Sequence, residues 1–593
     1  MVTVKNIRDN PLSVWRQQGP LARTALKHIS RVDALEAWYE EWLREHSSSY
    51  GKHGPFLDFV LGKLKLDVTV HHRELLDAVP DSGPLFIVAN HPLGGVEGML
   101  IAQMLLKIRP DLKVLTNDLL KIFPEFHELF IGVDVLSPGK QIENGKGVRA
   151  VMKHVHKGGA VLIFPAGTVS TIEVPSMSVT DVNWNPMITR LAMRLQVPLL
   201  PMFVAGKNGN AFYLSAFIHK RLRTLLLPRA MIKKQGSRLD LYVGRMVPAR
   251  DLAVFKDPET ATGFLRLTCE LLKDNKSIEE KSGANIDALC PDLDAALLRD
   301  HLSKQSTYRL IERGDFEVYA MPHDKMGPVM RQLAIERERT FRNVDEGTGL
   351  ALDSDRFDPL YDHLLLWDRV KGRIAGGYRL GRVDQIVKQA GLAGVYSHSL
   401  FRYDQRFLDS IGAAIEAGRS FVASEYQRRP DALELLWKGI GSYTVRHRGY
   451  HTLFGCVSIS PQYSRLASCL LRDSLLKYYG SEESLKKIVR ARNPIELNQR
   501  PWTDKQLEGL YTIPVLNKLL GCVDSALKVP VLIRHYLALN GKFVSFTVNQ
   551  DFNHSLDGLI VLDLRQMPKR HLKRYFGLED SSYFSQPEPE HVA

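Results

Sequence analysis

The 593-residue sequence contains little cysteine. Its five cysteines are odd in number, and no two of them have the Cys-x-x-Cys spacing of a metal or redox motif. Cysteine that is sparse and irregularly spaced argues against a disulfide framework and against a zinc site. We therefore expect a reducing compartment and no metal site.

Long hydrophobic runs are also lacking. No segment holds about eighteen uninterrupted apolar residues, the length that a conventional transmembrane helix needs. The N-terminus carries Arg8, Asp9 and Arg16 and has no apolar run before Ala25, which does not fit a secretory signal peptide. We therefore predict a cytoplasmic protein that lies peripherally on the inner face of the cytoplasmic membrane.

Positive charge is concentrated in one window. The chain has a formal net charge of +13, and residues 201–250 carry ten basic side chains against one acid. Such a window attracts phospholipid headgroups, an acidic carrier protein or nucleic acid, although a solvated basic face without a partner is also compatible with it. Over residues 220–238 the basic side chains alternate with leucines 225–227 rather than with stacking aromatics, which favours anionic lipid and argues against nucleic acid.

The pattern along the chain predicts an α/β protein with two domains. Hydrophobic residues make up 44% of the sequence, enough for more than one core at this length. From residue 84 to 245, short apolar runs that end in Gly, Asn or Pro alternate with longer helical stretches, and a second mixed segment follows an acidic stretch. The predicted parts are a helical region (1–75), a first domain (76–255), a linker (256–305), a second mixed α/β domain (306–570) and a tail (571–593).

The first candidate site follows the predicted strand at residues 85–89. The sequence there is Asn90-His91-Pro92-Leu93-Gly94-Gly95-Val96-Glu97. If the loop folds back, the carboxylate can fix the tautomer of the imidazole while the other ring nitrogen takes a proton from a hydroxyl. By itself the pair is also compatible with a capping histidine and an unrelated surface glutamate.

A second stretch, Phe164-Pro165-Ala166-Gly167-Thr168-Val169-Ser170, follows another apolar run. Together the two stretches resemble the glycerophospholipid acyltransferase family, which has Asn-His followed by an acid and later Phe-Pro-Glu-Gly-Thr-Arg-Ser. The resemblance covers about residues 80–250 and implies that His91 is the general base on an acceptor hydroxyl and that Glu97 orients it. The substrate-binding residues that it implies are Asn90, Gly94, Gly95, Phe164, Pro165, Ala166, Gly167, Thr168 and Ser170.

The departures from that family pattern are informative. Glu97 lies one residue further from the histidine than the usual acid, a spacing shared by the haemolysin-like branch. Ala166 and Val169 stand where the family has the Glu and Arg that help to hold a phosphorylated glycerol, so the resemblance implies an acceptor without glycerol phosphate. Because a thiolate is already a good leaving group, acyl transfer from a thioester needs no metal or cofactor.

Four short motifs follow one another in the second domain. They are Arg337-x-x-x-Phe341, Asp355-x-x-Asp358, Gly376-x-x-Arg379-Leu380 and Glu416-x-Gly418-Arg419. Taken singly, they are compatible with a surface arginine, a loop cap and a β-bulge. As an ordered set they resemble the GNAT-superfamily N-acyltransferases, in the branch shared by ornithine lipid synthases and acyl-homoserine-lactone synthases, over about residues 310–565.

This resemblance assigns roles. Glu416 would hold or deprotonate the amine acceptor, while Arg379 and Arg419 would organise the acidic loop and the acyl donor. Arg337, Phe341, Asp355 and Asp358 would belong to the same substrate site.

The donor is also suggested by this resemblance. The stretch 427–432 lacks the first glycine of the usual pyrophosphate loop, although backbone amides at a helix N-terminus there could still bind a phosphate. The branch is expected to use acyl carrier protein rather than free coenzyme A, and basic residues such as Arg428 and Arg429 suit an acidic carrier.

The fusion of the two halves resembles bifunctional ornithine lipid synthases. The second domain would attach a 3-hydroxyacyl chain to the α-amine of ornithine, and the first would then esterify the free hydroxyl of that chain. Acidic residues such as Asp355, Asp358 and Glu416 favour a cationic acceptor, but glycine, lysine or another amine stays open. A phospholipid-remodelling acyltransferase and a haemolysin-like membrane-interaction protein are further alternatives.

Overall fold

The computed structural model divides the chain into two compact units. The first comprises residues up to 275 together with 500–526, and the second comprises 276–499 together with 527–593. The structure describes residues 30–117, 123–133, 141–173, 178–181, 183–209, 212–213, 225–255, 257–274, 286–497, 500, 502, 504–508, 512–524 and 526–585.

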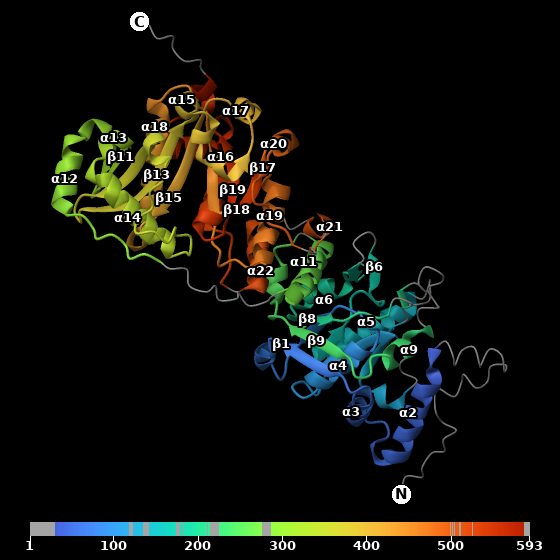
Figure 1. The fold of residues 1–593 in the computed structure, drawn as a ribbon. Coiled ribbons are helices and arrows are strands. Elements are labelled where there is room, and N and C mark those ends of the chain that lie inside the picture. Colours follow the sequence, from blue (N-terminus) through green and yellow to red (C-terminus); the bar gives the residue numbers. More distant parts are fainter. Residues whose placement is uncertain are drawn as a thin grey trace. The chain divides into compact units, whose positions relative to one another are not determined.

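The first unit is built on a seven-stranded sheet of order β1-β9-β8-β2-β5-β3-β4 (Figure 1). Neighbouring strands are parallel except that β9 runs antiparallel to β8. The strands are β1 (Asp67–His71), β2 (Leu85–Ala89), β3 (Lys113–Asn117), β4 (Phe130–Val133), β5 (Ala160–Ile163), β8 (Leu199–Ala205) and β9 (Arg238–Val243), with a small hairpin of β6 (Thr171–Glu173) and β7 (Ser178–Thr180). The helices are α2 (Val32–Glu45), α3 (His53–Leu64), α4 (Val96–Leu105), α5 (Gln141–His156), α6 (Met187–Leu195), α9 (Leu227–Ile232), α10 (Ala249–Leu252), α11 (Pro258–Leu271), α21 (Asp504–Leu507) and α22 (Ile513–Val523).

The central strand β2 shows why this sheet forms. All five of its residues are buried, as expected for a strand covered on both faces. Leu85 and Ile87 pack in the core that α3 and α4 share, whereas the carbonyl of Val88 faces Cys269 of α11. Because β2 lies between β5 and β8 and is parallel to both, the turns that follow these three strands meet at one edge of the sheet.

The second unit contains an eight-stranded sheet of order β10-β11-β12-β13-β15-β16-β19-β18. Its neighbours are antiparallel except β15 and β16. The strands are β10 (Arg309–Arg313), β11 (Phe316–Pro322), β12 (Asp362–Asp368), β13 (Arg373–Arg382), β15 (Ala414–Val422), β16 (Thr452–Ile459), β18 (Lys542–Asn549) and β19 (Ser555–Asp563), with β14 (Phe401–Arg402) pairing separately with β17 (Arg490–Ala491). The helices are α12 (Ala295–Lys304), α13 (His323–Met326), α14 (Pro328–Arg342), α15 (Val383–Ala390), α16 (Tyr396–Leu400), α17 (Gln405–Ile411), α18 (Pro430–Arg446), α19 (Arg465–Tyr479), α20 (Glu483–Ile488), α23 (Val531–Ala538) and α24 (Lys569–His571).

Different helices pack on the two faces of this sheet. Leu436 of α18 packs with Leu364 on one face, whereas Leu333 of α14 packs with Leu365 on the other. Successive residues of a strand point to opposite faces, so Leu364 and Leu365 serve the two cores. The strands β15 and β16 pair only at their first three residues, Ala414–Glu416 with Thr452–Phe454, and then stop pairing.

The α/β fold class is confirmed, but the predicted boundaries differ from the structure in several places. The predicted linker contains α11 and α12. Helix α11 starts at Pro258 after the capping side chain of Asp257, and its apolar residues lie in the core of the first unit. The balance of charge suggested a linker there, but apolar residues at helical spacing decide the structure.

Three further predictions about organisation need correction. The helical region 1–75 also supplies the edge strand β1, and its residues 1–29 lie outside the described residues. The segment 500–526 was assigned to the second domain, but α22 packs on α11 and Lys518 pairs with Asp251 in the first unit. The predicted tail contains residues Leu572–Phe576. Their apolar side chains pack against α18 and belong to the same core.

The predicted membrane features are only partly within the described residues. Lys220, Arg221 and Arg223 of the basic window lie outside them. Within the part of the chain that the structure describes, no helix is both long enough and apolar enough to cross a membrane.

Candidate active sites

The predicted histidine and carboxylate of the first unit lie together. His91 Nδ1 is 3.0 Å from Glu97 Oε1. Glu97 is fully buried in the first turn of α4, where its Oε1 accepts hydrogen bonds from the amides of Leu93 and Gly94, both 2.9 Å, and its Oε2 accepts one from Gly95 at 3.1 Å. Burial by itself raises the pKa of Glu97, but the His91 ring and backbone amides outweigh it and hold the pKa at about 2. An ionised carboxylate therefore faces Nδ1, which leaves Nε2 as the ring atom that can take a proton.

The backbone of His91 is fixed as well. Its amide donates to Asp181 Oδ1 at 3.1 Å, and its carbonyl accepts from the Ser170 amide at 2.8 Å. The side chain of Ser170 donates to the same oxygen of Asp181 at 2.5 Å, and Trp184 Nε1 donates to Oδ2 at 2.9 Å. Asp181 therefore ties the turn after β2 to the Ser170 turn after β5, although no motif of the sequence identified it.

Two other predicted residues shape the histidine turn. Asn90 exchanges side-chain hydrogen bonds with the backbone of Val204 at 2.7 and 3.0 Å, which joins the ends of β2 and β8. Gly94 has φ +89°, and a Cβ there would lie 2.5 Å from Leu227 and 2.8 Å from Val169. Asn90 and Gly94 thus position the loop, and Gly95 contributes its amide to Glu97.

The second block of the first unit lies beside His91. The ring of Phe164 lies 4.6 Å from that of His91, between centroids. Gly167, with φ +65°, closes a turn by donating its amide to the Phe164 carbonyl at 2.9 Å. Ala166 and Pro165 are buried, so Gly167 and Thr168 are the members of this block that solvent reaches most.

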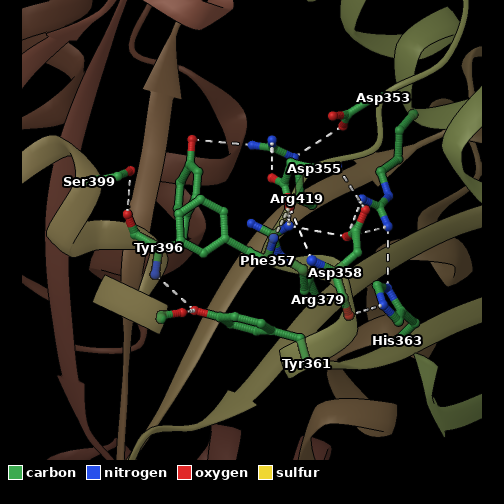
Figure 2. Close-up of polar contacts among 12 residues, drawn as sticks. Asp353, Asp355, Phe357, Asp358, Tyr361, His363, Arg379, Tyr396, Ser399 and Arg419 are labelled. Atoms are coloured by element: carbon green, nitrogen blue, oxygen red, sulfur yellow. Dashed lines mark hydrogen bonds and ion pairs between the residues drawn. The ribbon is translucent and has the colours of Figure 1, made fainter. Parts of the chain in front are cut away.

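The second unit gathers its predicted arginines and aspartates into one buried network (Figure 2). Arg337 Nη1 and Arg379 Nη1 each lie 3.1 Å from Asp358 Oδ1, and Arg379 Nη1 also lies 2.6 Å from Asp355 Oδ1. Arg419 extends this network, because its Nη2 lies 2.7 Å from Asp355 Oδ2. Its Nε lies 3.1 Å from Asp353, a carboxylate that sequence reasoning missed.

The charges of this network balance one another. Burial raises the pKa of Asp358, but Arg337 and Arg379 outweigh it and hold that pKa well below its ordinary value. Burial and Arg337 lower the pKa of His363 to about 3, so this histidine is neutral, accepts from Arg337 Nη2 at 3.2 Å and donates to the Asp358 carbonyl at 3.0 Å. Paired charges hold Arg337 and Asp358 in place, so these two act as positioning residues, whereas Arg379 Nε and Nη2 are buried without a hydrogen-bond partner among the described residues.

Glu416 is buried and held by donors from Tyr361 and from the start of α16. It is 2% exposed and accepts hydrogen bonds from the Tyr361 hydroxyl and from the amides of Tyr396 at 3.0 Å and Ser397 at 2.7 Å. The carboxylate thereby fixes the start of α16, and Figure 2 shows Tyr396 lying over the arginine network. Arg419 Nη1 donates to the Tyr396 hydroxyl at 3.2 Å. This geometry gives Glu416 a positioning role, and its predicted contact with the acceptor stays a prediction.

The last predicted residue of this set, Phe341, packs away from the arginines. Its ring lies 6.4 Å from that of Phe421 and 6.2 Å from that of Phe552, between centroids. The ring of Phe552 in turn lies 4.3 Å from the Arg419 guanidinium, so Phe341 supports the network through Phe552.

Two buried carboxyl groups of the second unit have pKa values raised close to neutral pH. Burial raises the pKa of Asp557 on β19 to about 6 and that of Glu346, which follows α14, to about 7. Ser458 donates to Glu346 at 2.6 Å and pairs with Asp557 across β16 and β19. Asn549 donates to Asp557 at 2.9 Å and to the Tyr396 hydroxyl at 3.3 Å, which joins this pair to the network. Groups with such pKa values can take a proton near neutral pH.

An apolar pocket lies where β15 and β16 stop pairing. Its walls include Ala417 of β15, Leu453 and Gly455 of β16, Ile440 of α18 and Ile560 of β19. A Cβ on Gly455 would lie 2.0 Å from the Ala417 carbonyl oxygen, so this glycine lets the two backbones approach. In the part of the chain that the structure describes, no cluster of His, Cys, Asp and Glu could hold a metal ion.

Comparison with known proteins agrees with this division. The chain matches the family described as Acyltransferase over residues 55–277 and the one described as Acetyltransferase (GNAT) domain over residues 337–438. An L-ornithine N(alpha)-acyltransferase of Agrobacterium fabrum is 30% identical over 38% of this chain and 72% of its own length. The chain belongs to the L-ornithine N(alpha)-acyltransferase family.

Two further relatives of this acyltransferase are named for glycine. A glycine N(alpha)-acyltransferase of Bacteroides thetaiotaomicron is 27% identical over 43% of this chain and 80% of its own length. A lyso-glycine lipid O-acyltransferase of Phocaeicola vulgatus is 26% identical over 41% of this chain and 84% of its own length. One chain thus resembles both N-acyltransferases and lipid O-acyltransferases.

The matched ranges of the acyltransferase contain most of its motifs, but not all of the polar groups described above. The GNAT match spans the motifs from Arg337 to Arg419 and ends before Asp557. Asp557 belongs to no motif, and its signal in the sequence is a carboxylate inside the otherwise apolar strand 555–563. Glu346 and Asp353 offer no such signal, because they lie in a polar loop.

Proposed function

We propose that this acyltransferase makes an aminolipid in two consecutive steps. In the second unit, the α-amine of ornithine attacks the carbonyl of a 3-hydroxyacyl thioester, the C–S bond breaks, and the carrier thiol leaves. In the first unit, the free hydroxyl of the resulting amide attacks the carbonyl of a second acyl thioester, the C–S bond breaks, the carrier thiol leaves, and an ester forms. The presence of one acyltransferase site in each unit supports this order, because the first product supplies the nucleophile of the second reaction.

The observation that carries the O-acylation step is the pair of His91 and Glu97. The Nε2 of His91 takes the hydroxyl proton as oxygen attacks, and the buried carboxylate of Glu97 stabilises the imidazolium that forms. Ala166 and Val169 are buried apolar residues, so neither position supplies a charge for a phosphorylated acceptor. A lyso-aminolipid is an acceptor without that phosphate.

For the N-acylation step, the pocket at the β15–β16 opening would hold the acyl chain. The amine loses its proton to Asp557 or Glu346, whose raised pKa values lie near neutral pH, while Glu416 stays bound to backbone amides. The arginine network keeps Tyr396 and the β15 bulge in position beside them.

We include acyl carrier protein as the donor of this proposal. Arg428 and Arg429 are exposed at the start of α18, where an acidic carrier can dock. A carrier thioester brings its own leaving group, so the proposed reactions use no other cofactor. Peripheral membrane contact also belongs to the proposal, because Arg229 and Lys233 are exposed on and beside α9, next to partly buried leucines.

Glycine is the second candidate for the acceptor. The observation that favours it is the similarity to relatives named for glycine and for lyso-glycine lipid. The chemistry of both steps is the same for either amino acid, so only the headgroup of the product differs.

Lipid analysis of a bacterial host that lacks aminolipids tests this function. Expression of the chain should produce a new lipid with two acyl chains, and its headgroup fragment should identify ornithine. A glycine headgroup would change the acceptor and leave the two steps in place. No new lipid, despite folded protein and a supply of 3-hydroxyacyl carrier, would contradict the proposal and favour phospholipid remodelling or a non-enzymatic membrane role.

A further inference from the structure

The pocket at the β15–β16 opening is apolar except for three polar groups. Tyr378, Trp437 and Tyr536 line it together with aliphatic side chains. The hydroxyls of Tyr378 and Tyr536 lie 3.5 Å apart, and the ring of Trp437 lies 5.8 Å from that of Tyr536, between centroids. Two phenols and one indole from β13, α18 and α23 therefore meet at one pocket.

The indole of Trp437 is poorly satisfied. Trp437 is 1% exposed, and its Nε1 makes no aligned hydrogen bond to a described residue, although it lies within reach of the Tyr378 hydroxyl. Buried indole N–H groups usually have a partner, so a donor left over in a pocket wall indicates a missing acceptor. The two hydroxyls are at the outer limit of hydrogen-bonding distance, so a third oxygen to one side of the pair can bond to both.

The backbone directs Tyr378 into this pocket. The pairing of β13 with β15 is irregular between Gly377 and Arg379, where the single residue Tyr378 lies opposite Arg419 and Ser420 of β15. Arg379, the next residue, belongs to the ionic network. Successive residues of a strand point to opposite faces, which gives these two neighbours separate tasks. Burial raises the pKa of Tyr378 and that of Tyr536, so both phenols keep their protons and can donate as well as accept.

We propose that Tyr378, Trp437 and Tyr536 bind the hydroxyl of a 3-hydroxyacyl chain and make the second unit selective for hydroxylated donors. This inference rests on the proposed N-acyl transfer and names the residues that choose its donor. A hydroxyl accepts from the Trp437 N–H and exchanges hydrogen bonds with the phenols. A plain acyl chain offers the Trp437 N–H no acceptor and leaves the two phenols with their existing partners only.

Selection at this point also serves the second reaction. Only a hydroxylated chain gives an amide whose hydroxyl the first unit can esterify. A plain chain would end as a mono-acylated product. Sites built to hydrogen-bond a substrate hydroxyl reject the analogue that lacks it strongly, and we expect a preference of about 100-fold here.

The test compares two carrier-bound donors of equal chain length, one with and one without the 3-hydroxyl, on the purified full-length chain. We measure kcat/KM for N-acylation with each donor, and the Kd of each as a non-reactive thioether analogue. The wild type should prefer the hydroxylated donor in both measurements. Trp437→Phe and Tyr536→Phe should each reduce that ratio about tenfold, because each removes one hydrogen-bonding group and keeps an aromatic side chain, which at position 437 is smaller than the indole.

Tyr443→Phe is the matched control. Tyr443 also lies on α18, but its hydroxyl donates to Asp362 at 2.6 Å and does not line the pocket, so the ratio should stay as in the wild type. Equal use of both donors by the wild type, or an unchanged ratio in Trp437→Phe, would overturn the inference and leave N-acyl transfer standing. If the wild type neither turns over nor binds either donor, that result would instead contradict the proposed function, and this inference with it.

Discussion

Glu97 Oε1 lies 3.0 Å from His91 Nδ1 while accepting two backbone hydrogen bonds, so a single oxygen fixes both the loop and the imidazole. The loop and the dyad are therefore one structural unit. A change at Glu97 affects orientation and charge together, and the protonation state of His91 depends on a carboxylate that solvent does not reach.

Glu97→Gln should reduce O-acylation by at least about 100-fold, because the amide lacks the charge that stabilises the imidazolium. The mono-acylated amide should accumulate, which mass spectrometry of extracted lipids measures. Glu74→Gln, on an exposed side chain that faces His72, is the control and should leave the lipid ratio unchanged. A normal yield of the diacylated lipid from folded Glu97→Gln would contradict the dyad.

The pH profile of N-acylation should report Asp557. Its pKa of about 6 means that the carboxylate becomes available as pH rises through 6, so the rate should rise over that range. Asp557→Asn should lower the rate at pH 7 by about 100-fold. Glu346→Gln distinguishes the two carboxyl groups. If the rise of the rate with pH is lost in Glu346→Gln and kept in Asp557→Asn, the rise belongs to Glu346. A profile that is flat from pH 5 to 8 in the wild type would contradict both assignments.

The raised pKa of Glu346 also predicts how the stability of the chain depends on pH. Its pKa is about 7 in the folded chain and near 4.5 when unfolded, so the folded state holds a proton that the unfolded state releases between these values. The free energy of unfolding therefore falls as pH rises from 4.5 to 7, by about 3 kcal/mol. Glu346→Gln removes this loss, so the variant should be more stable than the wild type at pH 8 and similar to it at pH 4. Urea denaturation at both values measures the difference, and equal stabilities at pH 8 would be the contrary result.

Arg379→Lys should damage the second unit more than its conservative nature suggests. Arg379 uses one nitrogen on both Asp355 and Asp358, and its guanidinium lies between the rings of Tyr361 and Tyr396, at 4.9 and 5.1 Å. We expect a loss of roughly 3–5 kcal/mol in unfolding free energy, because buried carboxylates lose a partner. Thermal unfolding measures it. Arg406→Lys, on an exposed arginine, is the control, and wild-type stability in Arg379→Lys would show that the network contributes little.

The motifs predicted which residues meet, but not what each of them does. The spacing of Arg337, Asp358 and Arg379 agreed with one network, and His91 lies beside Glu97 as expected. The role of Glu416 could not be predicted in this way, because its partners are the backbone amides of residues 396 and 397, and an amide leaves no trace in residue type. Residue type alone suggested that the acidic side chain of Glu416 binds an amine.

Features that arise from packing were missed altogether. The raised pKa of Asp557 comes from burial between strands that are far apart in the sequence, and no local pattern reveals it. The apolar face of α22 predicted a helix, yet periodicity does not say which core receives that face. This is why segment 500–526 was assigned to the second domain although it packs in the first unit.

The division of labour between the units is the central claim, and one labelling experiment tests it most directly. A host that lacks aminolipids receives labelled ornithine and expresses the wild type, His91→Ala or the control His156→Ala, which replaces an exposed histidine on α5. The account predicts labelled diacylated lipid from the wild type and the control, and labelled mono-acylated 3-hydroxyacyl-ornithine from His91→Ala. Loss of both labelled lipids in a folded His91→Ala protein would contradict it.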